Sequence, residues 1–205
     1  MASCVTEELI QVKSRDRSPI SIAYFYCKGG DTTRDSCDAI FRAILAQLLA
    51  QNSDIVPYFD SHHLELTHDP LKSEGLKSLV RAILTVLGVV YLVIDGLDEI
   101  DRSQRAEFFG VILPLVKSQL NDARYRVKLF LSSRGEEDIR TNLHSIGRIL
   151  RKSYEITSDD NHTDIACYVS YRAQELQRKF RLDDFRTVQI TKDVCERAGG
   201  KHPSD

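Results

Sequence analysis

The sequence predicts an α/β fold in which helices cover both faces of a parallel sheet. The run Val89–Ile94 is apolar throughout, and such a strand must be buried on both sides, as in parallel sheets. Strand-like and amphipathic helical segments alternate along the chain, which is the order of βαβ units. The 205 residues, 42% hydrophobic and 28% charged, suit one globular domain, or one domain plus part of a second.

The elements can be justified in order from their residue patterns. Apolar residues at helical spacing predict a helix over 2–15, and β-branched and aromatic residues predict a strand over 20–27. A wide apolar face predicts a helix over 36–51. The same patterns predict a helix over 71–87, the strand from Val89, a helix over 102–120, a strand over 125–131, a helix over 136–146 and a short strand over 154–156.

The pattern changes after about residue 160. Two consecutive helices are predicted, over 163–180 and 185–198, with Asn161 or Thr163 as the N-cap of the first. The polar, glycine-containing end 199–205 is expected to be frayed.

Three acidic residues, Asp95, Asp98 and Glu99, follow the buried strand directly. Ligands bind at the carboxyl ends of parallel strands, where one carboxylate can hold a Mg²⁺ that bridges two phosphates. Asp98 and Glu99 could then orient or deprotonate an attacking water. This is the pattern of a Walker B element. The alternative is a core strand that ends in a solvated acidic turn; we prefer the functional interpretation because three like charges crowd unless a cation offsets them.

Composition excludes several other classes of protein. The net charge of −2 gives no reason to expect nucleic acid or an acidic membrane as the main partner. Five cysteines without a C-x-x-C pair argue against a disulfide framework or a zinc ribbon and favour a reducing, cytoplasmic location. No apolar stretch approaches the length of a membrane span. His62, His63 and His68 lack a second ligand pair, so a solvated loop is expected there rather than a metal site.

Several landmarks occur together and in a family order. They are Ala23–Tyr26, a helix with Arg42, Ile44, Gln47 and Leu48, Asp95–Glu99, Leu131–Arg134, and Asn161–Ile165 with Tyr168 and Val169. With these residues the chain resembles the NACHT branch of the STAND P-loop NTPases. The resemblance is to the nephrocystin-3-like N-terminal type of fungal ankyrin-repeat and heterokaryon-incompatibility proteins.

The resemblance implies a three-layer sheet of the P-loop NTPase type and a role for each site residue. Asp95 would be the Mg²⁺-associated carboxylate, Asp98 and Glu99 the acidic pair linked to hydrolysis, and Arg134 the sensor of the γ-phosphate. The implied cofactors are Mg²⁺ with ATP or GTP, and the choice of base stays open. An arginine there can form charge-assisted bonds to a phosphate. The alternative for Arg134 is a surface ion pair with Glu99 or Glu136.

One family element does not occur in these residues, because no G-x-x-x-x-G-K-[ST] segment is present. Lys28-Gly29-Gly30 has the wrong order and is expected to be a turn. The resemblance therefore implies a chain truncated after the Walker A motif and before the winged-helix region, without the first strand. That strand would lie between the Arg134 strand and the strand over 154–156.

The domains implied are an incomplete NTPase core over 1–158, the start of a helical subdomain over 159–198, and the tail. We expect a fragment of a nucleotide-dependent signalling switch that does not hydrolyse nucleotide alone, with nucleotide, protein partners or self-oligomerisation in the intact protein. The alternative is a degenerate NACHT-like interaction scaffold that binds no nucleotide. Another phosphoryl-transfer or dinucleotide enzyme is disfavoured, because no G-x-G-x-x-G is present.

Overall fold

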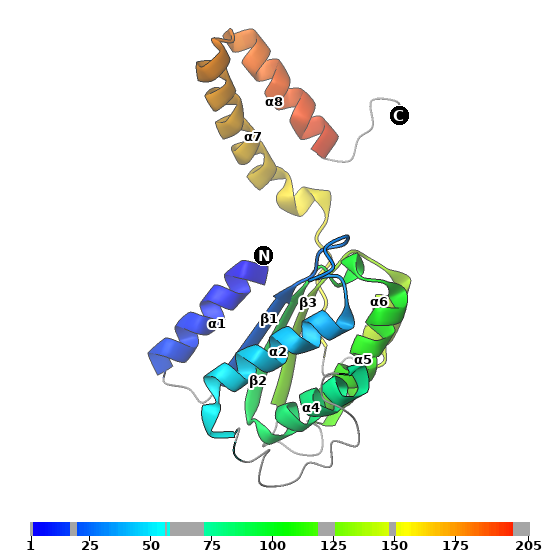
Figure 1. Ribbon diagram of the computed structural model, residues 1–205. Helices are drawn as coiled ribbons and strands as arrows, with labels where there is room; N and C mark the ends of the chain where they lie inside the picture. The colour runs from blue at the N-terminus through cyan, green and yellow to red at the C-terminus, as the bar shows by residue number, and fades with distance from the viewer. Residues whose placement is uncertain are drawn as a thin grey trace. The chain divides into compact units, whose positions relative to one another are not determined.

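The structure is a computed structural model, which describes residues 2–16, 20–55, 57, 72–118, 126–147 and 151–198 (Figure 1). The chain divides into two compact units, Met1–Arg151 and Lys152–Asp205, which are described separately as the first and second unit. The histidine-bearing loop and the tail 199–205 lie outside the described residues. Among the helices that are described, none has the length and apolar character needed to cross a bilayer.

A three-stranded parallel sheet forms the centre of the first unit, as the sequence predicts. Its strands are β1 (Ile20–Tyr26), β2 (Val89–Asp95) and β3 (Arg126–Ser132), in the order β1-β2-β3. The last residues of the three strands are partners in register, so all three strands end at the same edge. The apolar β2 lies in the middle, which explains why it is the most uniformly hydrophobic of the three.

Among the described residues, five helices accompany this sheet, and each was predicted from the sequence to within a few residues. They are α1 (Ala2–Asp16), α2 (Cys37–Gln51), α4 (Ser73–Val86), α5 (Arg102–Ser118) and α6 (Glu137–His144), with 3-10 turns at Ser53–Ile55 and Leu97–Glu99. Residues of α2, α4 and α5 form one hydrophobic core with the sheet. The core contains a cluster of three buried aromatic side chains, Phe41, Phe108 and Phe109.

Helix α1 lies on the opposite face and begins at the edge where the strands end (Figure 1). Phe25 faces the core beside α2, whereas the hydroxyl of the next residue, Tyr26, donates to Thr6 Oγ1 of α1 at 3.4 Å. Side chains alternate between faces along a strand, so these two contacts place α1 across the sheet from α2. The result is three layers, with the N-terminal end of α1 near the end of β1.

Two glutamines of α2 cover the outer edge of β1. Gln47 accepts from the Tyr24 N–H at 3.1 Å and donates to the Tyr24 carbonyl at 2.8 Å. Gln51 makes the same pair of bonds with Ile22, at 3.1 and 2.5 Å. The side-chain amides thus take the place of a neighbouring strand and blunt an edge that would otherwise invite pairing with another chain.

Replacement of Gln51 by alanine is expected to lower the free energy of unfolding by about 1–3 kcal/mol, because the buried Ile22 N–H and carbonyl lose their partners. The variant is also expected to self-associate through the uncovered strand edge. Urea denaturation and sedimentation velocity measure the two effects. Gln11→Ala is the control, since Gln11 is an exposed helical glutamine that bonds only Arg15 in the described structure. Equal behaviour of the two variants would contradict the edge-covering role.

The predicted strand over 154–156 is wrong. Residues 151–157 have no regular structure, and Tyr154 is 85% exposed. A strand needs a neighbour to satisfy its backbone groups, and among the described residues β3 pairs only with β2. Among the described residues the segment therefore has no neighbouring strand with which to form backbone hydrogen bonds.

The second unit is a helical hairpin of α7 (Ser158–Phe180) and α8 (Asp184–Ala198), which confirms both predicted helices. Val169 and Ala173 are its buried apolar residues. The predicted N-cap, Asn161 or Thr163, is wrong, because the helix begins earlier with Thr157 as its N-cap. The Asp160 carboxylate accepts from both the Thr157 N–H and its hydroxyl, each at 2.8 Å, a capping box that extends the helix by one turn.

Candidate functional site

The residues predicted to form a site come from the turns that follow β2 and β3, at the edge where the strands end. Asp95 is the last residue of β2 and pairs in register with Ser132 of β3. The Ser132 hydroxyl donates to Asp95 Oδ1. Because Asp95 shares its face of the sheet with Tyr26, it lies on the side covered by α1.

Gly96 turns the chain sharply after Asp95. Its φ is +69°, a left-handed conformation that glycine adopts without strain, and a β-carbon here would lie 3.4 Å from the Cys27 carbonyl. The Gly96 N–H donates to the Ser132 carbonyl at 3.0 Å, which holds the turn against β3. The 3-10 turn that follows carries Asp98 and Glu99 over the strand ends.

Asp98 and Arg134 are in direct contact. Asp98 Oδ1 accepts the Arg134 backbone N–H at 3.0 Å, and Asp98 Oδ2 lies 3.5 Å from Arg134 Nε. The Asp98 side chain is only 9% exposed, whereas that of Arg134 is 82% exposed. Because the guanidinium itself is surrounded by water, its 3.5 Å contact with the Asp98 carboxylate is screened and weak, and the side chain can reach outward.

Glu99 faces the turn after β1. Its Oε2 accepts the Gly29 N–H at 3.2 Å, and its Oε1 lies 4.0 Å from Arg134 Nη2. A β-carbon at position 29 would be 2.9 Å from Glu99 Oε2, so a larger residue would require the Glu99 carboxylate to shift away from the Gly29 N–H. Residues 28–31 form a turn, as predicted. Of the two alternative surface partners of Arg134, Glu99 lies near it, while Glu136 lies 4.0 Å from Arg105.

The thiol of Cys27 lies beneath this acidic group. Burial raises the pKa of Cys27 to about 12, and the charge of Asp95 adds to the effect. The thiol is therefore neutral at physiological pH, in agreement with the ordinary behaviour of a buried cysteine. The charges of Asp98 and Glu99 act on the pKa of Cys27 in the same direction.

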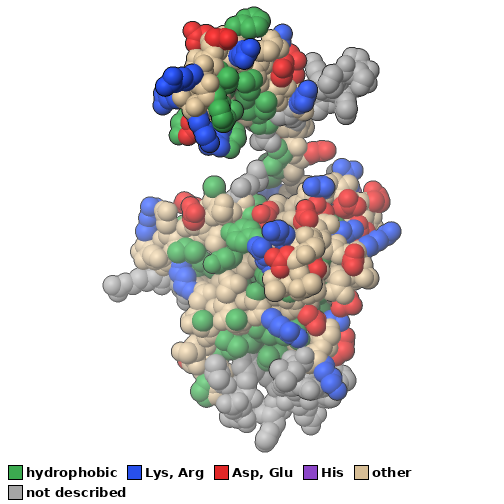
Figure 2. Space-filling view, turned by 45° about the horizontal axis from the view of Figure 1, so that its top comes forward, with side chains coloured by type: hydrophobic (Ala, Val, Ile, Leu, Met, Phe, Trp, Pro, Cys, Tyr) green, Lys and Arg blue, Asp and Glu red, His purple; other side chains and the backbone are tan. Residues whose placement is uncertain are grey.

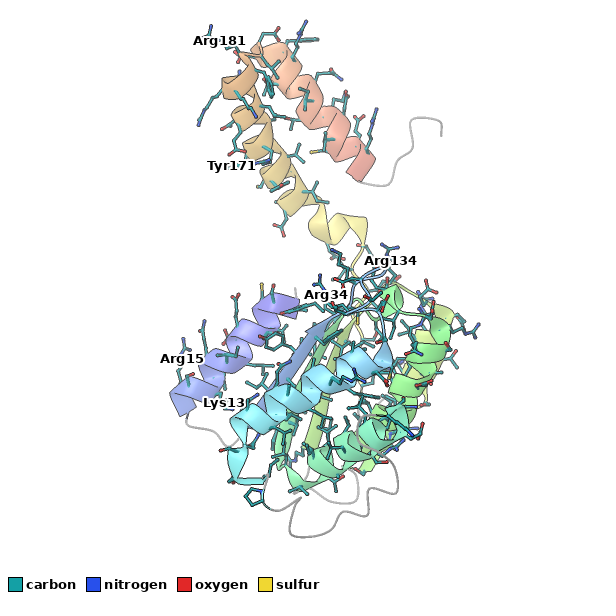
Figure 3. All side chains as sticks on the ribbon, viewed as in Figure 1. Lys13, Arg15, Arg34, Arg134, Tyr171 and Arg181 are labelled. Carbon is teal, nitrogen blue, oxygen red and sulfur yellow. The ribbon has the colours of Figure 1, made fainter. Side chains whose placement is uncertain are left out.

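Arg34 lies at this edge as well as Arg134, and the sequence pattern singled out Arg134 but not Arg34. Figure 3 shows Arg34 and Arg134 where the strands end, while Lys13 and Arg15 lie at the other end of α1. Arg34 binds Asp31 through Nε at 2.9 Å and through Nη2 at 2.8 Å. Hydrogen bonds from Thr33 and then Arg34 hold the pKa of Asp31 at about 2. In the sequence, Arg34 lies in a polar turn and belongs to no motif.

Arg105 and Asp138 were also missed. Arg105 is buried on α5 and binds both carboxylate oxygens of Asp138 on α6, at 2.7 and 2.9 Å. Neither residue belongs to a motif, and an arginine in the first turn of an amphipathic helix normally reads as solvent-exposed. Nothing in the local pattern could have identified the pair.

The acidic side chains at the strand ends can be compared with the groups that usually bind a divalent metal. Within the described ranges no three histidine, cysteine or acidic side chains are grouped so that they could hold a metal by themselves. Mg²⁺, however, is usually bound by one or two carboxylates together with phosphate oxygens and water. Asp95 fits that role only together with a phosphate-bearing ligand. On the face shown in Figure 2, acidic and basic side chains of the first unit are interspersed, without a broad field of one sign.

The parallel α/β sheet between helical layers, with a buried central strand that ends in acidic residues, is consistent with a P-loop NTPase-like fold. The strand that would precede α1 in such a fold is not among the described residues. A family model described as Nephrocystin 3, N-terminal, matches residues 1–134, and the chain belongs to that family. The match supports a STAND NTPase-related domain.

The chain is also similar to a curated fungal protein, the vegetative incompatibility protein HET-E-1 of Podospora anserina. The two are 22% identical over 183 residues, which cover 85% of this chain and 13% of the relative. The chain thus spans a small part of that protein's length. No solved structure matches the chain significantly.

Proposed function

We propose that this chain contributes the metal-binding and phosphate-sensing side of a nucleotide-dependent signalling switch of the NACHT type. One observation carries the proposal: the start of α1, Asp95 and Arg134 all lie at the edge where the strands end. These are the three kinds of group that a Mg²⁺-bound triphosphate needs. The family match over residues 1–134, which suggests a STAND NTPase-related domain, supports this role.

Each residue has a role that follows from its position. Asp95 would hold Mg²⁺, which would neutralise charge on the phosphates. The first turn of α1 contains no acidic residue, so no carboxylate there opposes the positive dipole end that would attract phosphate oxygens. Asp98 and Glu99 would orient or deprotonate the attacking water where hydrolysis occurs.

Arg134 would act as the sensor. A terminal phosphate competes with Asp98 for the exposed guanidinium, so the Arg134–Asp98 contact would loosen in the triphosphate state and re-form after its loss. A two-state contact of this kind is how a ligand biases a switch. Residues 1–158 would belong to the nucleotide-binding core, and residues 159–198 would begin a helical subdomain. Nucleotide-dependent assembly with protein partners or further copies would be the output.

A second candidate is an interaction scaffold that binds no nucleotide. It is favoured by the lack of a G-x-x-x-x-G-K-[ST] segment in the 205 residues. The contacts of Asp98 with Arg134 and of Glu99 with Gly29 also satisfy those groups without a ligand. In this case the acidic turn would be a structural link between the strand ends.

Titration of the full chain with fluorescent ATP and GTP analogues, with Mg²⁺ or with a chelator, separates the two candidates. We expect weak, saturable, Mg²⁺-dependent binding that falls about tenfold or more, roughly 1.4 kcal/mol, in Asp95→Asn. Asp54→Asn is the matched control, because Asp54 is exposed after the end of α2. Helix α2 starts next to the strand ends, so Asp54 lies toward the opposite edge. Lack of saturable binding by the unmodified chain would reject the switch in favour of the scaffold.

A further inference from the structure

The guanidinium of Arg105 joins three segments of the first unit. Its Nε and Nη2 donate to the two carboxylate oxygens of Asp138, at 2.7 and 2.9 Å. Its Nη1 donates to the backbone carbonyl of Ile100 at 2.9 Å and to that of Asp98 at 3.2 Å. The residue is only 7% exposed, so these bonds form largely out of contact with water.

These contacts connect Arg105, Asp98, the Arg134 segment and Asp138 in a ring. Asp98 is bound through its carbonyl by Arg105 and through its carboxylate by Arg134. Arg134 lies four residues before Asp138, and Asp138 returns to Arg105. The buried side chain of Arg105 therefore connects the acidic turn to the segment that bears Arg134. We call this set of Arg105 contacts, with Asp138 and with the carbonyls of Asp98 and Ile100, the clamp.

The chemistry of the clamp requires arginine. A planar guanidinium can present two parallel donors to a carboxylate while a third nitrogen points elsewhere. The ammonium of lysine is a single point of charge and cannot span the carboxylate and two carbonyls in the same geometry. A further acid, Glu136, lies 4.0 Å from Arg105 Nη2 and its side chain is 48% exposed, so it is a minor partner.

We propose that Arg105 is a positioning residue that sets the acidic turn, Asp98 and Glu99, against the Arg134 segment. The consequence for ligand binding rests on the proposed nucleotide function, whereas the positioning itself does not. If Arg105 keeps Asp98 in place, a change at Arg105 should alter the hydrogen bond from the Arg134 N–H to the Asp98 carboxylate. The two arginines are not in direct contact with each other in the described contacts, so such an effect would pass through Asp98.

The test is Arg105→Lys in the full chain, observed by NMR of the ¹⁵N-labelled protein. We expect the Arg134 amide proton to move upfield and its hydrogen exchange to become about tenfold faster, because its bond to the Asp98 carboxylate is weakened. Mg²⁺-dependent affinity for the ATP analogue is expected to fall several-fold. Lys77→Arg is the control: Lys77 is another buried cation, with ion pairs to Glu74 at 2.7 Å and Glu107 at 3.0 Å.

A second variant keeps the test decisive if Arg105→Lys does not fold. Asp138→Asn retains the shape of the side chain but weakens the clamp, and it should move the Arg134 amide in the same direction by a smaller amount. An unchanged Arg134 amide in the folded variants would overturn the positioning role. A changed amide with unchanged nucleotide affinity would overturn its link to the ligand.

One further outcome separates this proposal from the proposed function. If the unmodified chain binds no nucleotide and the Arg134 amide still responds to Arg105→Lys, the positioning role is supported and the switch is rejected.

Discussion

Replacement of Phe108 by alanine is expected to lower the free energy of unfolding by about 3–5 kcal/mol, the range for removing a buried aromatic ring. Phe108 has no exposed surface. Its ring lies 6.1 Å from that of Phe41 on α2 and 5.6 Å from that of Phe109, measured between centroids. The substitution would open a cavity where α2 and α5 meet beneath the sheet.

Urea denaturation followed by circular dichroism measures this loss. Phe108→Leu should cost less, because leucine fills part of the cavity. Phe185→Ala is the control, since Phe185 is 78% exposed on α8 and its loss should change stability by no more than about 0.5 kcal/mol. Similar losses for Phe108→Ala and Phe185→Ala would mean that the first unit is not held together by this aromatic cluster.

Replacement of Asp138 by alanine is expected to have an effect of similar size, about 3–5 kcal/mol, because it leaves the Arg105 guanidinium buried without its charge partner. The Asp138 side chain is only 11% exposed. Glu196→Ala removes an exposed pair with Lys192 and should cost about 0–1 kcal/mol. Equal effects of these two variants in urea denaturation would contradict a buried role for the Arg105–Asp138 pair.

The same pair predicts a pH dependence. Hydrogen bonds from Arg105 hold the pKa of Asp138 below its ordinary value of 3.8, against the opposing effect of burial. A carboxyl whose pKa is lower in the folded than in the unfolded chain stabilises the fold fully above its unfolded pKa. That stability is lost as the pH falls below 3.8 through the lower folded value.

Urea midpoints measured from about pH 5 downward should therefore fall more steeply for the unmodified chain than for Asp138→Ala. Asp31 also has a lowered pKa and titrates in both proteins, so the difference between the two curves isolates Asp138. Parallel curves would show that Asp138 does not have a lowered pKa in the folded chain.

The fold could be predicted from the sequence because its elements are repeated local patterns. The apolar run of β2 requires burial on both faces, and the apolar face of α2 requires a sheet to cover. The acidic residues after β2 and Arg134 after β3 were expected at one edge because parallel strands end together, and the structure brings Arg134 into contact with Asp98. The prediction of a strand over 154–156 was wrong because a strand depends on a partner strand that its own residues do not specify.

The sequence by itself thus determined the order of helices and strands, the parallel sheet and the edge at which the acidic turn lies, because burial and hydrogen-bond periodicity are local properties. Only the tertiary structure decided which distant side chains meet. Arg105 and Asp138 are 33 residues apart, and Gln51 binds the backbone of Ile22 from 29 residues away. Such contacts depend on how helices pack against strands, so the clamp behind the site and the covered edge of β1 emerge only when the layers are assembled.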